Sequence, residues 1–235
     1  MSNPLPFLTA RQTIHLVRGH TQSRSFHSFA SYDVYLELLK KHLDQYHVKL
    51  HAYVLTQREV HLLMTPCDVL QTNFMMESLE EEYQQKLVEF HGINQPPWKN
   101  LSRWRLIEPG TFLLPSMQDI ENLPVRLNLC HAAIEHPWSS YACNALSRRN
   151  ALISPHSVYL QLGNAPASRA ARFRAFTVHG ATNNPAIISQ HIKNGSPPGD
   201  DQFKQASKGE KSRWFERLGL RNTVYTPPGY QGSAD

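Results

Sequence analysis

The sequence predicts an α+β fold, a ferredoxin-like split βαββαβ domain followed by an irregular, mostly helical C-terminal extension. Two observations carry this prediction. Short segments of alternating apolar and polar residues are separated by two longer segments with helical spacing, in the order strand, helix, strand, strand, helix, strand. After Trp138, prolines and glycines interrupt every longer pattern and leave only short helical segments.

The first three strands and the first helix follow from the spacing of apolar residues. Residues 13–18 alternate and predict a strand, and residues 31–45 have the spacing of an amphipathic helix with Ser31 as its N-cap. Residues 49–55 and 59–64 predict two further strands. Because only a short turn separates them, they are expected to form a β-hairpin.

A second helix is predicted over residues 73–91, ending at Gly92. Residues 103–107 predict the fourth strand, and residues 116–129 a helix that Pro124 bends or breaks. The apolar stripe of the second helix consists of Met76, Leu79, Tyr83, Leu87 and Phe90.

The chain is expected to divide into a sheet domain over residues 1–141, a helical extension over residues 142–225 and a disordered tail over residues 226–235. Within the extension, residues 167–176 and 183–193 are the helical segments. The role of this extension is not readable from its pattern.

Composition excludes several classes of protein. The chain has 235 residues, 40% of them hydrophobic and 18% charged, which is typical of a globular protein. No apolar run approaches the about 18 residues of a membrane-spanning helix, and the N-terminus lacks a secretory signal pattern. Three cysteines without a CxxC pair give no support to a disulfide framework or a zinc site. A cytoplasmic location without membrane association is therefore expected.

The net charge of +5 permits nucleic-acid binding without requiring it. The charge is unevenly distributed. Residues 1–66 carry a net +3, residues 67–91 a net −5 and residues 92–235 a net +7. Basic segments therefore flank one acidic segment.

Glu59 and His61 are candidate metal ligands. Residues at i and i+2 of a strand point to the same face, so a carboxylate and an imidazole here are placed to share one divalent cation. This ligand pair suits Mn²⁺, and Mg²⁺ less well. The alternative is a solvated hairpin carboxylate beside a half-buried strand histidine.

Tyr83 is a candidate nucleophile, because a tyrosine hydroxyl attacks a phosphodiester when a metal polarises the phosphate oxygens. The alternative is a core aromatic residue within the apolar stripe of the second helix. The neighbouring run Glu80-Glu81-Glu82 repels a phosphate backbone.

Basic and aromatic residues alternate in two segments, a composition that can hold a nucleic-acid strand by phosphate pairing and base stacking. Solvated helix faces with a buried aromatic edge have the same composition. The two sets are Trp98, Lys99, Arg103, Trp104 and Arg105, and Arg169, Arg172, Phe173, Arg174 and Phe176.

Several ordered sequence blocks resemble those of the REP-associated branch of the single-tyrosine HUH transposases, also called RAYTs, over residues 13–213. The blocks are His15-Leu16-Val17-Arg18-Gly19 with Arg24-Ser25-Phe26, Leu50 to Leu55, Val60 to Pro66, Glu77 to Tyr83, Asp119 to Arg126, His136 to Tyr141, Ser154 to Leu160, and Gly195 to Phe203.

The resemblance implies a ferredoxin-like domain that recognises hairpin or single-stranded DNA and nicks one strand through a phosphotyrosine, with Mg²⁺ or Mn²⁺ as cofactor. Carried over by position, the nucleophile falls on Tyr83, the second metal histidine on His61 and the first on Glu59. The resemblance also suggests a monomer. The expected nucleic-acid contacts are Arg18, Arg24, Lys99, Arg103, Arg105 and Arg126.

Three functions stay open at this level. The first is a transposase-like nickase that uses Glu59, His61 and Tyr83. The second is a catalytically degenerate, domesticated relative that binds hairpin DNA or RNA as a regulator. The third is a protein-interaction domain that keeps only the fold.

Overall fold

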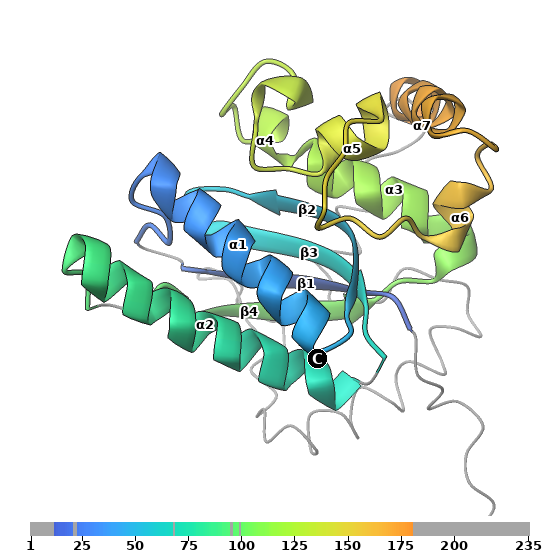
Figure 1. The fold of residues 1–235 in the computed structure, drawn as a ribbon. Coiled ribbons are helices and arrows are strands. Elements are labelled where there is room, and N and C mark those ends of the chain that lie inside the picture. The colour runs from blue at the N-terminus through green and yellow to red at the C-terminus, as the bar shows by residue number, and fades with distance from the viewer. Residues whose placement is uncertain (1–11, 21–22, 68, 95, 99, 181–235) are drawn as a thin grey trace, which may run out of the picture.

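The computed structural model describes residues 12–20, 23–67, 69–94, 96–98 and 100–180, and its strands form one antiparallel sheet (Figure 1). The four strands are β1 (Ile14–His20), β2 (Lys49–Leu55), β3 (Glu59–Thr65) and β4 (Asn100–Leu106). Their order in the sheet is β2-β3-β1-β4. With one helix after β1 and another after β3, this is the predicted ferredoxin-like split arrangement.

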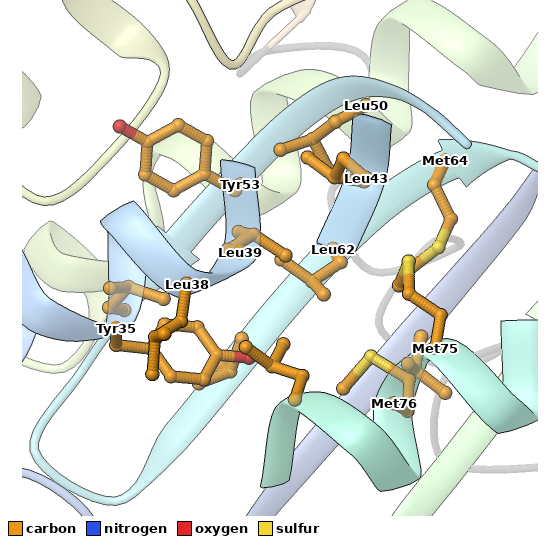
Figure 2. Close-up of a cluster of buried hydrophobic side chains, with 14 of the residues drawn as sticks. Tyr35, Leu38, Leu39, Leu43, Leu50, Tyr53, Leu62, Met64, Met75 and Met76 are labelled. Atoms are coloured by element: carbon orange, nitrogen blue, oxygen red, sulfur yellow. The ribbon is translucent and has the colours of Figure 1, made fainter. Parts of the chain in front are cut away.

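Helices α1 (Phe29–Gln45) and α2 (Val69–His91) cover one face of the sheet (Figure 1). Side chains from both helices and from the facing side of the strands form the larger apolar cluster, part of which Figure 2 shows. Its buried members include Tyr35, Leu39, Leu62, Met64 and Met76. Burying a large apolar side chain contributes about 1.5–3 kcal/mol, so this cluster is the main stabilising feature of the fold.

The start of α1 differs from the prediction. Ser28, not Ser31, is the N-cap, and Ser31 occupies the third helical position of a capping box. The Ser31 N–H donates to Ser28 Oγ at 3.3 Å, while the Ser28 N–H donates to Ser31 Oγ at 3.2 Å. In a capping box, each of the two side chains accepts the main-chain N–H of the other residue. Because both positions suit a serine, the sequence alone does not show which serine is the N-cap.

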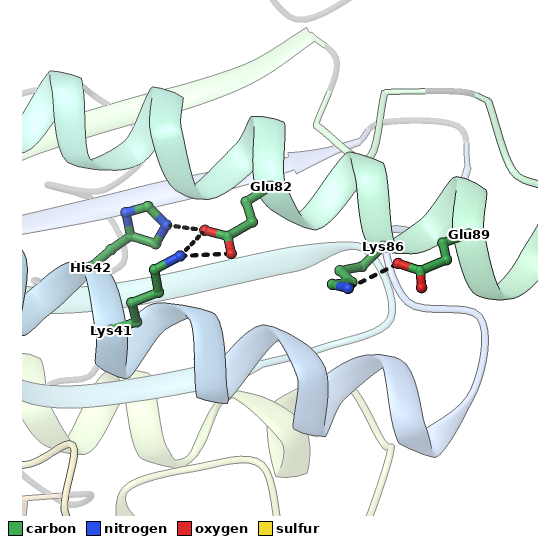
Figure 3. Close-up of polar contacts among 5 residues, drawn as sticks. All are labelled: Lys41, His42, Glu82, Lys86 and Glu89. Atoms are coloured by element: carbon green, nitrogen blue, oxygen red, sulfur yellow. Dashed lines mark hydrogen bonds and ion pairs between the residues drawn. The ribbon is translucent and has the colours of Figure 1, made fainter.

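Polar side chains join α1 to α2 at the surface (Figure 3). Lys41 Nζ lies 2.7 and 2.8 Å from the two carboxylate oxygens of Glu82, and His42 Nε2 lies 2.9 Å from Glu82 Oε2. The hydrogen bonds from Lys41 and then His42 lower the pKa of Glu82. The acidic segment predicted from the sequence is therefore α2, and part of its charge is balanced by α1.

The opposite face of the sheet carries a second helical layer on the β2 side (Figure 1). It consists of α3 (Pro109–Glu121), α4 (Leu123–Arg126), the 3-10 helix η1 (Ala133–Glu135), α5 (Tyr141–Leu146), α6 (Ser157–Leu160) and α7 (Pro166–Gly180). A smaller apolar cluster anchors this layer to the sheet and includes Ala52, Val54, Leu63, Leu113 and Phe173. No helix in the described ranges has the length and apolar character needed to cross a bilayer.

The single helix predicted over residues 116–129 is two helices. α3 starts at Pro109 because the Glu108 carboxylate accepts the N–H groups of Gly110 and Thr111, at 2.8 and 3.0 Å. The break falls at Asn122, and Pro124 then lies in the first turn of α4, where its missing N–H costs nothing. The predicted break near Pro124 is confirmed, but the start of the helix was placed too late.

The chain after η1 also covers the outer edge of β2. The N–H of Leu55 donates to Trp138 O at 2.9 Å, and the N–H of Ser154 donates to Leu50 O at 2.8 Å. Isolated bridges join Val54 to Ser139 and Leu50 to Ile153. Segments on both sides of the boundary predicted at residue 141 therefore pack against β2. The predicted helix 167–176 lies within α7, while helix 183–193 and tail 226–235 lie outside the described residues.

Candidate nucleic-acid interface

Glu59 and His61 lie side by side on the sheet, on the face opposite α1 and α2. Along β3, Val60, Leu62 and Met64 belong to the cluster under α1 and α2, whereas Leu63 packs toward α3. Because side chains alternate along a strand, Glu59 and His61 share the α3 side with Leu63. His61 Nε2 lies 3.0 Å from Glu59 Oε2, so the structure brings these two predicted residues together.

A third residue, His15, completes this group. Its Nε2 lies 3.1 Å from His61 Nδ1, across the β1–β3 pairing. Exposure falls along the row, from 38% for the Glu59 side chain to 14% for His61, and His15 is buried. His15 is not among the metal ligands predicted from the sequence. The signal that identifies it is the alternation in β1, which places His15 and Val17 on the face of His61.

The two predicted ligands fit a divalent cation as neighbouring donors. Donors bound at about 2.1 Å on adjacent corners of an octahedron lie about 3 Å apart, close to the 3.0 Å between Glu59 Oε2 and His61 Nε2. His15 then acts as the outer partner that fixes the His61 ring. In the ranges that the structure describes, no group of three or more His, Cys, Asp or Glu side chains is arranged to hold a metal. Water or substrate phosphate would therefore occupy the remaining coordination positions of such an ion.

A second polar row on the same face has a structural role. His51 Nδ1 donates to Ser154 O at 2.6 Å, and His51 Nε2 accepts from Thr65 Oγ1 at 2.8 Å. Thr65 in turn lies 2.8 Å from Thr13 Oγ1, which lies 3.4 Å from His156 Nε2. Burial lowers the pKa of His51 to about 4, so the ring is neutral at pH 7. This row ties the extension to β1, β2 and β3.

Tyr83 lies on the other side of the sheet. The residue is fully buried in the cluster under α1 and α2, and its hydroxyl donates to the main-chain oxygen of Ser25 at 3.1 Å. Its ring packs against Tyr35, Phe26 and Trp98, with centroids 5.3, 5.8 and 6.0 Å away. Burial raises the pKa of Tyr83 well above its ordinary value. The structure thus does not bring Tyr83 together with Glu59 and His61.

The predicted phosphate-binding residues occupy different environments. Arg18 faces α2, where its Nε lies 3.2 Å from Glu80 Oε1. Arg24 is exposed after β1, and Arg126 pairs with Asp119 at 2.9 Å. Arg103 and Arg105 belong to β4, with their main chains paired to Val17 and His15 of β1, and Lys99 lies outside the described residues.

The alternation of basic and aromatic residues does not produce a stacking surface. Phe173 is fully buried and packs edge-on against Tyr159 at 5.7 Å. Trp98 and Trp104 pack against the cluster under α1 and α2. Phe173, Trp98 and Trp104 thus contribute to the core, whereas Phe176 is 38% exposed.

No protein-family model and no curated protein sequence matches this chain significantly. Among solved structures, the chain is similar to a REP-associated tyrosine transposase bound to a REP hairpin, with a TM-score of 0.51 and 12% sequence identity. The match covers 66% of this chain and 93% of the other.

The chain has the fold of a REP-associated tyrosine transposase. The resemblance predicted from the sequence blocks is thereby confirmed at the level of fold, which is what an identity of 12% supports. In this transposase fold, Glu59, His61 and His15 occupy the sheet face away from α1 and α2, and Tyr83 the face beneath them.

Proposed function

We propose that this protein is a transposase-like DNA-binding protein that recognises hairpin or single-stranded DNA on the sheet face of Glu59 and His61. The observation that carries the proposal is the shared fold with a REP-associated tyrosine transposase whose structure holds a REP hairpin, over 93% of that chain. The Glu59–His61–His15 row supports the choice of face, because it is a partly exposed polar group on the face away from α2.

Electrostatics supports the same face. Helix α2, on the other side of the sheet, carries Glu77, Glu80, Glu81, Glu82 and Glu89 against Lys86 and the terminal His91. A DNA backbone is repelled from such a helix and attracted to basic surfaces elsewhere.

Glu59 and His61 are the residues that would hold Mg²⁺ or Mn²⁺ in this protein. A divalent cation there supplies positive charge that orients and polarises a bound phosphate group. Glu59 contributes a hard oxygen donor, and His61 contributes a nitrogen whose orientation His15 fixes through the opposite ring atom.

We place binding ahead of cleavage through Tyr83. A tyrosine nucleophile must reach the phosphate and lose its proton, whereas Tyr83 is fully buried, donates its hydrogen to Ser25 O and has a raised pKa. These three properties favour the degenerate, binding-only relative over the active nickase.

Fluorescence anisotropy with the full chain tests the binding proposal. A DNA hairpin with single-stranded flanks is expected to bind more tightly than a scrambled strand of equal length, and an RNA hairpin of the same sequence tests DNA against RNA. Affinity is expected to fall with salt, with a logarithmic slope of about −0.7 per phosphate contacted on a single strand. Equal affinity for hairpin and scrambled DNA, or no salt dependence, contradicts the proposal.

Formation of a covalent protein–DNA adduct tests whether the protein only binds DNA or also cleaves it through Tyr83. With the flanked hairpin and Mg²⁺ or Mn²⁺, we expect wild type and Tyr83→Phe to behave alike and form no covalent protein–DNA product. A metal-dependent adduct in wild type that Tyr83→Phe abolishes would instead establish the nickase, with α2 opening on binding.

A further inference from the structure

The segment from His136 to Gly180, which includes α5, α6 and α7, carries charge of one sign only. It contains five arginines, at positions 148, 149, 169, 172 and 174, and no Asp, Glu or Lys. These arginines belong to one folded unit, because α5 contacts α7, and α6 and α7 contact α3, within an apolar cluster that includes Ala145, Tyr159, Leu113 and Phe173 (Figure 1).

Three of the arginines are oriented by main-chain carbonyl groups. Arg169 Nη1 donates to Gly163 O and Asn164 O at 3.0 and 3.2 Å, and Arg172 Nη1 donates to Leu162 O at 2.6 Å. Arg174 Nη1 donates to Ala145 O at the end of α5. Cations at helix ends complement the dipole, but a carbonyl oxygen orients a guanidinium without cancelling its charge.

Arg148 and Arg149 have no such structural role. Both follow directly on Ser147, whose left-handed conformation (φ 59°) ends α5, and both are exposed. In the described ranges, neither side chain makes a hydrogen bond or ion pair, and Arg169 and Arg172 make no ion pair either. Within the described residues, no carboxylate offsets the charge of these four guanidinium groups, so they attract an anionic ligand.

The geometry points to a second nucleic-acid surface: we infer that Arg148, Arg149, Arg169 and Arg172 bind the phosphate backbone of a hairpin stem. This inference rests on the proposed function and adds a binding surface to it. The aromatic residue between Arg172 and Arg174, Phe173, is buried, so the arginines themselves offer charge rather than base stacking. Such contacts fix position and add affinity but read no sequence. The surface belongs to the helical layer on the side of the sheet that carries Glu59 and His61.

The test uses the full chain with Arg148→Ala/Arg149→Ala and a blunt DNA hairpin without single-stranded flanks. Each lost phosphate contact on a duplex reduces the salt slope by about 0.9. Wild type is therefore expected to lose about tenfold more affinity than the variant between 50 and 200 mM salt. The relative affinities of hairpins that differ only in stem sequence stay unchanged, because the contacts are to phosphates.

Matched variants separate charge from structure. Lys40→Ala/Lys86→Ala removes the same charge from the α1–α2 layer and is expected to change affinity less than twofold. Arg148→Lys/Arg149→Lys keeps the charge and is expected to keep the wild-type salt slope, whereas a role in fold stability would not be restored by lysine. Melting temperatures of all variants verify folding.

The outcomes distinguish the two proposals. If wild type binds the hairpin but Arg148→Ala/Arg149→Ala matches the Lys40→Ala/Lys86→Ala control, the second surface is wrong and the proposed function stands. If wild type itself binds no hairpin, the proposed function fails and the inference with it. An effect confined to single-stranded DNA also overturns the assignment to the stem.

Discussion

The two helical layers on either side of the sheet differ in charge and in the way they are attached. The α1–α2 layer packs on the larger apolar cluster and presents the acidic helix α2. The second layer packs on a smaller cluster, and its segment 136–180 carries five arginines without an acidic residue. Along the sequence, the acidic segment is simply flanked by basic ones. In three dimensions the acidic helix α2 and the arginine-containing segment 136–180 lie on opposite sides of the sheet, so a DNA backbone is repelled less on the side of that segment.

The second layer contains a fully buried carboxyl group. Glu121, at the end of α3, is fully buried, and its Oε1 accepts from Ser140 Oγ at 2.6 Å and from Asn144 Nδ2 at 2.7 Å. Its Oε2 has no hydrogen-bond partner in the part of the chain that the structure describes. Such a carboxyl group couples the attachment of the extension to pH.

The largest expected effect comes from breaking the apolar attachment of the extension. Phe173→Ala removes a fully buried ring packed against Tyr159 and is expected to lower the free energy of unfolding by about 3–5 kcal/mol. Urea denaturation measures this loss. Phe176→Ala, on the same helix but 38% exposed, is the matched control. A small effect at Phe173 would mean that α7 contributes little to the folded unit.

A pH-dependent effect of similar size is expected at Glu121. Burial raises its pKa from 4.5 to about 7, so between these values the unfolded chain has lost the proton that the folded chain still binds. Stability therefore falls as pH rises through this window. Relative to Glu121→Gln, wild type is expected to lose about 3 kcal/mol between pH 4 and 7.5.

Unfolding curves of both proteins at several pH values measure this difference. His51, with its pKa lowered to about 4, makes stability rise between pH 4 and 6.5. Because both proteins contain His51, its contribution cancels when wild type is compared with the glutamine variant. Parallel stability curves for wild type and Glu121→Gln would show that the Glu121 carboxyl is not the source of a pH dependence.

The smallest expected effect is in the first layer. Glu82→Gln weakens the contacts with Lys41 and His42, but because Lys41 is 56% exposed and Glu82 28%, the loss is expected to be about 1 kcal/mol or less. A double-mutant cycle with Lys41→Met isolates the pair. DNA affinity should not fall, since the change removes negative charge; a clear decrease would place a binding surface on the α1–α2 side.

Most of the fold could be predicted because it depends on local periodicity. The hairpin of β2 and β3 follows from alternation, and Met76, Leu79, Tyr83 and Leu87 of the predicted stripe are indeed buried. Phe90, the last member of that stripe, is 59% exposed, because α2 extends beyond the core there.

The candidate site was only partly predictable for a physical reason. Spacing within β3 places Glu59 and His61 on one face, but no local pattern states which face α2 will cover. The match by sequence blocks therefore assigned Tyr83 to a site on the opposite side of the sheet. His15 was missed because its partner lies on a strand 46 residues further along the chain, and that pairing depends on sheet order.

The main-chain bonds from Trp138, Ser140 and Ser154 to β2 have a consequence for assembly. β2 is an outer strand of the sheet, and an outer strand with open N–H and C=O groups is a template for further strands. With the groups of Leu50, Tyr53 and Leu55 occupied, neither a second copy nor a foreign peptide can extend the sheet beside β2. Self-association by strand addition is thereby restricted to the β4 side.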